Sequence, residues 1–254
     1  MTKVIRIAKW ILLLMLVLSL VMIAREMLRG KKEQNALEEL SQAALVVPQS
    51  SSANEEESAP APEAELPKRQ PVHDIAQLQE LNSDTLCWLT IPDTRVDYPV
   101  MHTPQEPQKY LRLSFEHEYA ISGVPFLQEN CTLDSQNLVI YGHNMKNGTM
   151  FSDITLYADR AYCADHSLVL LETTSGVREY SVYAAACVKS NDPWYYFESA
   201  SNPDQFYEKL EDISAKALYL GNNTPEYGQQ LLTISTCYGA NDDDRILIIA
   251  VQNQ

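Results

Sequence analysis

The hydrophobic and polar positions divide the chain into three parts, and the first is an apolar run. Trp10 to Ala24 contains no charged residue. Extended back to Val4, the run covers about 21 residues, and as a helix it measures roughly 30 Å, the hydrocarbon thickness of a bilayer. Residues 1–32 are therefore predicted to be an N-terminal membrane anchor with basic flanks, and residues 4–24 to cross the membrane.

A cleaved signal peptide is the competing interpretation of this run. The residues from Met22 to Met27 lack small side chains at both positions that a signal peptidase favours, so an uncleaved anchor is predicted. Charge does not fix the orientation of the anchor. Three Lys or Arg residues precede the run and four follow it, so the positive-inside rule finds no clear asymmetry.

The second part, residues 33–70, is predicted to be a stalk. Glu33 to Ala44 has the composition of a polar helix that continues the anchor. Pro48 to Pro67 is rich in Ser, Ala, Pro and Glu and has no aromatic residue. Such a composition cannot bury enough apolar surface to become ordered, so this stretch is expected to be flexible.

The third part, residues 71–254, has the pattern of one mainly β globular domain. Apolar residues at helical spacing predict a short helix that ends at Asn82, and two later helices at 150–157 and 203–218. Short apolar runs separated by turn-forming residues predict an antiparallel barrel or sandwich. The predicted strands are Cys87–Ile91, Tyr98–Met101, Val124–Leu127, Leu138–Tyr141, Leu168–Glu172, Arg178–Val188, Leu231–Thr236 and Ile246–Gln252.

Charge narrows the possible partners. The formal net charge is -15, and residues 1–32 hold seven of the 19 Lys and Arg residues but one of the 34 acidic ones. The rest of the chain is therefore strongly acidic. A nucleic-acid partner is not expected, because phosphate binding needs a basic surface to replace counterions.

The candidate chemistry lies at the ends of predicted strands. Cys237 ends the run Leu231–Thr236, and Arg245 begins the next run after a short polar turn. Such a pair of runs favours a hairpin, in which these two residues are neighbours about 5 Å apart. His143 follows another predicted strand directly. A thiol, an imidazole and a guanidinium at strand ends are the parts of a cysteine acyl-transfer site.

Each of the three residues also has a purely structural interpretation. A single cysteine at a strand end is often a small buried apolar residue. Arg245 could balance Asp242 to Asp244 in a solvated turn, and His143 could be a structural histidine beside the Asn147-Gly148 turn. The combination of all three at strand ends favours the catalytic interpretation.

The motifs around these residues resemble those of class B sortases. The matching stretches cover roughly residues 72–254, and their order and spacing are more specific than any single motif. They are Asn82 to Val100 with Trp88, Ile91-Pro92, Thr94 and Asp97, then Tyr110-Leu111, Tyr141 to Met145, Met150-Phe151, Ser235 to Cys237, and Arg245. The resemblance implies a closed sortase-type β-barrel with an N-terminal helix and an added helix between late strands. It also implies a domain outside the cell, held by a single-pass N-terminal anchor in the cell membrane of a Gram-positive-type bacterium.

The residues and the resemblance together predict a cysteine transpeptidase. Cys237 as thiolate attacks a peptide carbonyl, Arg245 stabilises the oxyanion or the substrate backbone, and His143 protonates the departing amine. A thioester on Cys237 results, which an amine then resolves. The resemblance implies that the substrate is the C-terminal sorting signal of an exported protein, cut between Thr and Gly. It implies an amine of peptidoglycan or a pilin lysine as the acceptor.

Four further residues are expected to bind the sorting peptide. Ser235 and Thr236 precede the nucleophile, and strand alternation places Ser235 on the same face as Cys237. Tyr195 and Tyr196 belong to an aromatic cluster that by resemblance forms a wall of the groove, although a plug in the core is an equally open interpretation. Two other functions also stay open. They are a cysteine endopeptidase that releases its product to water, and a non-catalytic, membrane-tethered peptide-binding module.

No cofactor or metal ion is expected. The other four histidines are scattered, and no cysteine pair has zinc-ligand spacing. Two disulfides among Cys87, Cys131, Cys163 and Cys187 would leave Cys237 unpaired. Apolar neighbours around Cys87 and Cys187 favour buried free thiols instead.

Overall fold

The computed structural model describes residues 2–46 and 69–253, and it separates into two units. The first unit ends at Leu40 and contains most of the long N-terminal helix α1, which runs from Thr2 to Ala43. Its segment Lys9–Ala43 is long and apolar enough to cross a membrane, and its large apolar side chains from Trp10 to Leu28 are exposed. The helix continues through the polar residues up to Ala43, as their composition indicated. The predicted flexible stretch, Pro48 to Pro67, lies outside the described residues.

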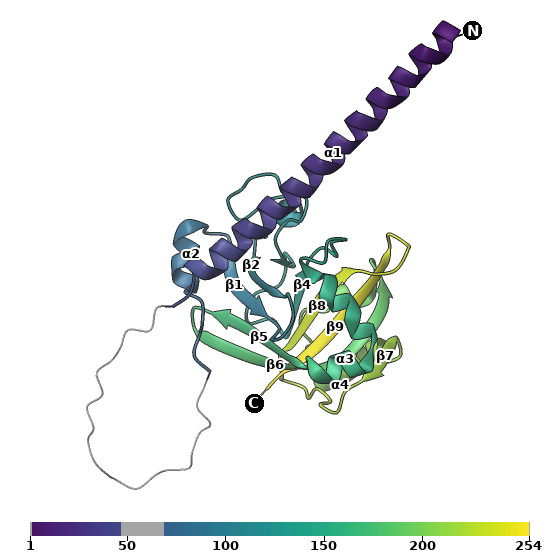
Figure 1. Ribbon diagram of the computed structural model, residues 1–254. Coiled ribbons are helices and arrows are strands. Elements are labelled where there is room, and N and C mark those ends of the chain that lie inside the picture. The colour runs from purple at the N-terminus through teal and green to yellow at the C-terminus, as the bar shows by residue number, and fades with distance from the viewer. Residues whose placement is uncertain (1, 47–68, 254) are drawn as a thin grey trace. The chain divides into compact units, whose positions relative to one another are not determined.

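The second unit contains a closed β-barrel, shown in Figure 1. Eight strands form the ring in the order β5-β1-β2-β3-β4-β8-β9-β6, and β5 pairs with β6 to close it. β6 is 14 residues long, so its first half closes the ring and its second half also pairs with β7 outside it. The expected mainly β, closed barrel is confirmed. The strands are β1 (Thr85–Thr90), β2 (Asp97–Met101), β3 (Phe126–Leu127), β4 (Asn137–Tyr141), β5 (Leu168–Thr173), β6 (Gly176–Lys189), β7 (Ala217–Leu220), β8 (Leu231–Cys237) and β9 (Asp244–Gln252).

Two strand pairs are parallel, so the expected antiparallel pairing does not hold throughout the barrel. β2 pairs in parallel with β3, and β4 pairs in parallel with β8 from Asn137↔Leu231 to Tyr141↔Ser235. Long connections separate the strands of each pair, which makes parallel pairing possible. Parallel strands end at the same edge of a sheet. The residues that follow β4 and those that end β8 therefore meet at one rim of the barrel.

The core explains why β9 is apolar almost throughout and why β8 carries no charged residue. Six consecutive residues of β8, Leu231 to Thr236, are buried, and so are six of β9, Ile246 to Val251. Strands covered on both faces lose the alternation of apolar and polar residues. Inside the barrel lies the core, and outside it the helix η2 (Phe151–Ala158) packs on both strands through buried residues such as Phe151.

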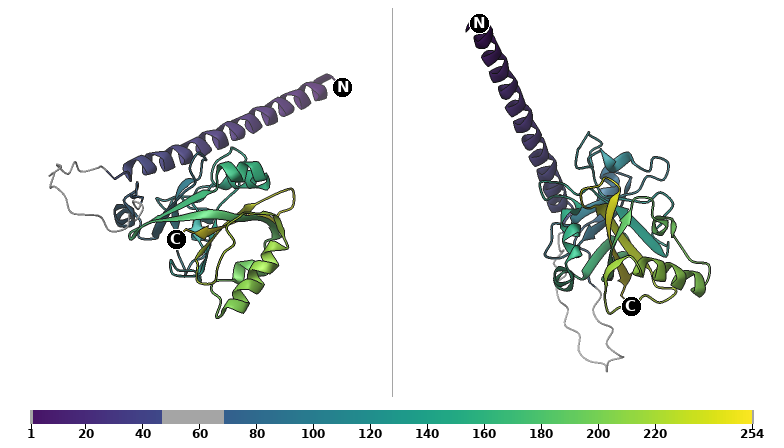
Figure 2. Two further views of the ribbon diagram at one scale, coloured as in Figure 1. Left: turned by 90° about the horizontal axis from the view of Figure 1, so that it is seen from below. Right: turned by 90° about the vertical axis from the view of Figure 1, so that its right-hand side faces the viewer.

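Short helices complete the second unit. They include α2 (Ile75–Leu81), η1 (Lys109–Leu111), α3 (Arg160–Asp165) and η3 (Pro193–Tyr196), besides η2. The added helix between late strands is α4 (Pro203–Ser214), which lies on the outside of the barrel in Figure 2. The predicted end of α4 at residue 218 was wrong. The segment Ala217–Leu220 pairs with β6 as β7, because the open edge of β6 offers backbone hydrogen bonds.

The two sides of the undescribed segment are joined within the second unit. Leu45 and His73 form a β-bridge. The Val46 N–H donates to the Val72 carbonyl at 2.8 Å, and the Asp74 N–H donates to the Ala44 carbonyl at 2.7 Å. The residues that follow α1 are thus part of the same folded body as the barrel.

Candidate active site

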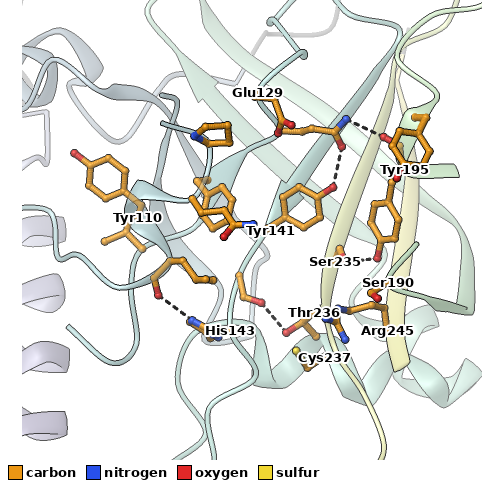
Figure 3. Close-up of a pocket in the computed structure, with 18 residues that line it drawn as sticks. Tyr110, Glu129, Tyr141, His143, Ser190, Tyr195, Ser235, Thr236, Cys237 and Arg245 are labelled. Carbon is orange, nitrogen blue, oxygen red and sulfur yellow. Dashed lines mark hydrogen bonds between the residues drawn. The ribbon is translucent and has the colours of Figure 1, made fainter. Parts of the chain in front are cut away.

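A groove opens at the rim where β4 and β8 end, and its volume is about 540 Å³. Figure 3 shows the side chains that line it. Cys237, Arg245 and His143 all belong to the lining, so the fold brings together the three residues that the sequence singled out. The other lining residues are Pro107, Gln108, Tyr110, Leu111, Val124, Phe126, Gln128, Glu129, Tyr141, Gly142, Ser190, Tyr195, Tyr196, Ser235 and Thr236.

Cys237 is the residue at which β8 emerges from the core. The six residues before it are buried, whereas Cys237 is exposed. It is the only exposed cysteine of the five, and all five are free thiols. Its backbone carbonyl accepts a hydrogen bond of 3.0 Å from the side-chain amide of Asn144. This bond ties the loop after β4 to the end of β8, and so fixes the residue next to His143 against the thiol-bearing strand.

Arg245 faces Cys237 across the hairpin. The two residues are paired in the antiparallel register of β8 and β9, as the sequence predicted, so their side chains lie on the same face. In Figure 3 the guanidinium lies beside the thiol. One of its nitrogens, Nη1, donates to the carbonyls of Asp242 at 2.5 Å and Asp244 at 2.9 Å. These bonds hold the guanidinium in place from the backbone of its own turn.

His143 is held by the backbone on the opposite side of the groove. Its Nε2 lies 3.0 Å from the carbonyl oxygen of Leu111 in η1. Burial lowers the pKa of His143, the hydrogen bond to Leu111 partly opposes that effect, and the nearby positive charge of Arg112 adds to it. The imidazole is therefore poised to lose a proton more readily than an exposed histidine.

Gly142 lets the strand end approach η2 closely. A Cβ built at this position would lie 2.4 Å from Cδ2 of Phe151, which no real side chain tolerates. The Phe151 N–H also donates to the His143 carbonyl at 2.9 Å. A residue without a side chain is therefore required directly before the imidazole.

Comparison with known proteins agrees with this geometry. The Sortase domain family model matches residues 89–253. The Sortase B of Listeria monocytogenes is 31% identical over 175 residues, which cover 68% of this chain and 70% of the relative. This chain belongs to the class B sortases. The Sortase B of Staphylococcus aureus is 25% identical over 178 residues, covering 68% of this chain and 72% of the relative.

Solved structures share the fold. The Staphylococcus aureus sortase B-substrate complex aligns with a TM-score of 0.66 at 22% identity, covering 71% of this chain and 84% of that one. The Listeria monocytogenes sortase B aligns with a TM-score of 0.61 at 29% identity, covering 70% of this chain and 99% of that one. The present protein is thus a sortase, an enzyme of the cysteine transpeptidase type, with a candidate membrane anchor in α1.

The four residues expected to bind substrate in this sortase all line the groove, but their exposure differs. The Ser235 hydroxyl is buried and lies 2.8 Å from the Tyr195 hydroxyl, and Thr236 Oγ1 donates to the Gly142 carbonyl at 2.8 Å. Tyr195 is 6% exposed, whereas Tyr196 is 77% exposed. Tyr195 therefore fits the core interpretation of the aromatic cluster as well as the groove wall. Tyr196 fits the groove wall alone. Their roles toward a peptide stay predictions.

Several residues of the sortase groove were not anticipated from the sequence. Tyr141 donates to Gln128 Oε1 at 2.8 Å, and Gln128 Nε2 donates to the Tyr195 carbonyl at 2.8 Å, which links the two walls. These residues are far apart along the chain, and no local pattern signals their meeting. Asn144 lies in the motif Tyr141 to Met145, but its bond to the Cys237 carbonyl was not anticipated either. In the part of the chain that the structure describes, no group of three or more His, Cys, Asp or Glu could hold a metal ion.

Proposed function

We propose that this sortase cleaves the C-terminal sorting signal of exported proteins between Thr and Gly and joins the new carboxyl end to an amine of peptidoglycan or of a pilin. The observation that carries the proposal is the parallel pairing of β4 with β8. It brings His143 to the rim where Cys237 and Arg245 are paired, around a groove that can hold an extended peptide. The Staphylococcus aureus structure named as a substrate complex supports the use of such a groove for a substrate.

The first half of the reaction forms a thioester. The Cys237 thiolate attacks the Thr carbonyl carbon, and the carbonyl oxygen becomes an oxyanion. Arg245 uses Nη1 for its own turn, and within the described residues its Nε and Nη2 have no hydrogen-bond partner, so these nitrogens keep donors for the oxyanion or the substrate backbone. The C–N bond then breaks, and the His143 imidazolium gives its proton to the departing Gly amine.

The second half of the reaction transfers the acyl group. The acceptor amine attacks the thioester carbon, and the now neutral His143 takes the proton that the amine loses. The C–S bond breaks, which releases the new amide and restores the Cys237 thiolate. If water attacks instead, the product is a free acid and the enzyme acts as an endopeptidase.

The contact of His143 with Leu111 indicates which ring nitrogen takes part in this proton transfer. A backbone carbonyl can only accept a hydrogen bond, so the Nε2 that contacts Leu111 carries a hydrogen in both charge states. The proton that moves in the reaction is therefore carried by Nδ1. The contact with Leu111 keeps the ring oriented through both halves of the reaction.

We also propose that residues 4–24 of α1 cross the cell membrane once and hold the catalytic unit outside. The length and apolar composition of the helix support this, together with its exposed apolar side chains. An extracellular position fits the proposed substrates, which are exported proteins and cell-wall amines.

The test uses the full chain in detergent with a fluorescent sorting peptide and an amine acceptor, read by mass spectrometry. Ligated product supports transpeptidation, hydrolysed product alone indicates an endopeptidase, and intact peptide indicates a binding module. Cys237→Ala should abolish both products. Cys187→Ala is the matched control, since this half-buried thiol on β6 does not line the groove, and it should keep activity. Cleavage that survives in Cys237→Ala refutes the nucleophile.

A further inference from the structure

The groove carries opposite charges at its two ends. Among the described residues that line it, Glu129 has the only carboxylate, and Arg245 has the only permanently positive side chain. Figure 3 shows Glu129 at the end away from Cys237, with Tyr141 and Tyr195 between them. The reacting end of the groove is thus positive, and the far end is negative.

The carboxylate of Glu129 is available to a ligand. Glu129 is exposed, and among the residues that the structure describes no Lys or Arg forms an ion pair with it. Glu129 contacts His102 through its backbone, whose carbonyl lies 3.4 Å from Nε2 of His102. A carboxylate at the wall of a groove without a cation of its own can pair with a cation that arrives with the substrate.

Neutral aromatic rings adjoin this carboxylate. Burial raises the pKa of Tyr141, and the neighbouring Tyr195, Glu129 and Tyr196 add to the effect, so the Tyr141 phenol keeps its proton. The Tyr141 and Tyr195 rings stack with centroids 5.7 Å apart, and Tyr196 presents most of its surface to solvent. The face of a neutral phenol ring attracts a cation, and a nearby carboxylate strengthens that attraction.

We propose that Glu129, Tyr141 and Tyr196 form a subsite for a basic side chain of the sorting peptide, on the part of the peptide that lies away from the scissile bond. The inference rests on the proposed function and adds a substrate preference to it. It selects for a Lys or Arg side chain and against Asp or Glu at one peptide position.

The geometry distinguishes a peptide side chain from the acceptor amine as the source of the cation. β3, which leads into Glu129, and β8, which ends at Cys237, are separated by β4 and so by two strand spacings, about 10 Å, and the register places Glu129 a further roughly 15 Å along the strands from Cys237. An extended peptide needs at least about five residues to cover that distance. An attacking amine must come within about 3.5 Å of the thioester carbon, so it cannot be held at Glu129 when it reacts.

The experiment compares peptides that differ only in Lys, Gln or Glu at each position before the scissile bond. The full chain in detergent is assayed for kcat/KM with a constant acceptor. At one position the wild type should prefer Lys over Gln by about fivefold, and the preference should shrink as salt is raised. Glu129→Gln should bring the Lys-to-Gln ratio near one, and Glu129→Lys should favour the Glu peptide. Glu80→Gln, an exposed carboxylate on α2 outside the groove lining, should keep the wild-type ratio.

Two further measurements separate the possible failures. Binding of the labelled peptides to Cys237→Ala tests the subsite without turnover: a Lys preference there that Glu129→Gln removes supports the subsite even if no peptide is ligated. Turnover of all peptides with equal kcat/KM at every position overturns the subsite and leaves the proposed function intact. A Glu129→Gln variant that changes the acceptor concentration needed for half-maximal ligation, but not the peptide preference, also overturns it.

Discussion

Nε2 of His143 lies 3.0 Å from the carbonyl oxygen of Leu111, a residue 32 positions earlier in the chain. The bond connects β4 to η1 across the groove, so the imidazole is oriented by backbone from a different element. Orientation by a backbone carbonyl does not add a negative charge beside the ring. The imidazole therefore remains easy to deprotonate, as a group that alternates between acid and base requires.

Arg112→Gln should raise the pKa of His143. Burial is the main cause of the lowered pKa, and the positive charge of Arg112 is a further one, so its removal makes the imidazolium less unfavourable. NMR titration of the ring should show the shift. The basic limb of the kcat/KM profile should move to higher pH with it, because acylation needs the protonated ring.

Arg112→Lys is the control for this change, since it keeps the charge and should keep the titration of His143 near that of the wild type. The Arg112 guanidinium also donates to the Ile121 carbonyl at 2.6 Å. Thermal unfolding of each variant therefore tests whether loss of this bond destabilises the fold. A His143 pKa in Arg112→Gln that is equal to or below the wild-type value would contradict the prediction.

Arg245→Lys should lower kcat by about 10²- to 10³-fold, the range found when one donor to an oxyanion is lost. Lysine keeps the positive charge but lacks the planar guanidinium fork. In Arg245 one nitrogen of this fork donates to the Asp242 and Asp244 carbonyls, and the other nitrogens keep donors for the substrate. Steady-state kinetics with a fixed peptide and acceptor measure the effect. Lys189→Arg, an exposed change on β6, is the control and should have wild-type kinetics. A lysine variant with near-wild-type kcat would show that charge alone is enough.

Much of this site could be predicted because its signals are local. The end of an apolar run, a short polar turn and the start of the next run made Cys237 and Arg245 neighbours, and the ladder of β8 and β9 confirms that pairing. The strand that precedes His143 was also visible as a short apolar run. The strand that pairs with it could not be predicted. The pairing of β4 with β8, and its parallel direction, depend on contacts between residues far apart in the sequence.

The end of α4 shows a second limit of sequence reasoning. Ala217 and Leu218 continue the helical spacing of the residues before them, but the edge of β6 lies within reach after Ser214. Tertiary hydrogen bonds to that edge outweigh a helical propensity of a few tenths of a kcal/mol per residue. Glu129 was missed for a similar reason, since a single exposed carboxylate acquires meaning only once the groove is known.

Gly142→Ala should reduce kcat by about 100-fold and destabilise the second unit by about 1–3 kcal/mol. The new methyl group would lie 2.4 Å from Cδ2 of Phe151, so the backbone that carries His143 must shift. Kinetics and urea unfolding measure the two effects. Phe151→Leu added to Gly142→Ala makes room for the methyl group and should recover part of kcat. If the fall in kcat of the double variant equals the combined falls of the two single variants, the contact with Phe151 does not position His143.

Glu172→Gln should destabilise the second unit by about 2–3 kcal/mol at neutral pH, because Glu172 is a buried carboxylate with three charged hydrogen bonds. Its Oε2 accepts from the N–H groups of Val72 and His73 at 2.8 Å each, and its Oε1 lies 3.3 Å from Nδ1 of His73. The His73 ring also stacks on Trp88 with centroids 4.1 Å apart. These contacts hold the segment of Val72 and His73, which bridges to Leu45, against the barrel.

The pH dependence identifies the charge as the cause of that loss. Burial raises the pKa of Glu172, but the hydrogen bonds from the side chain and backbone of His73 outweigh it, and the net pKa is lowered. A carboxyl group with a lowered pKa in the folded state contributes its full stability above the unfolded-chain value of about 4.3, and loses it as the pH falls through the folded value. The difference in unfolding free energy between wild type and Glu172→Gln, measured by urea titration, should therefore be constant from pH 8 to 6 and shrink toward acid pH. If the difference in unfolding free energy is the same at pH 3.5 as at neutral pH, the loss of stability comes from altered packing and not from the lost charge.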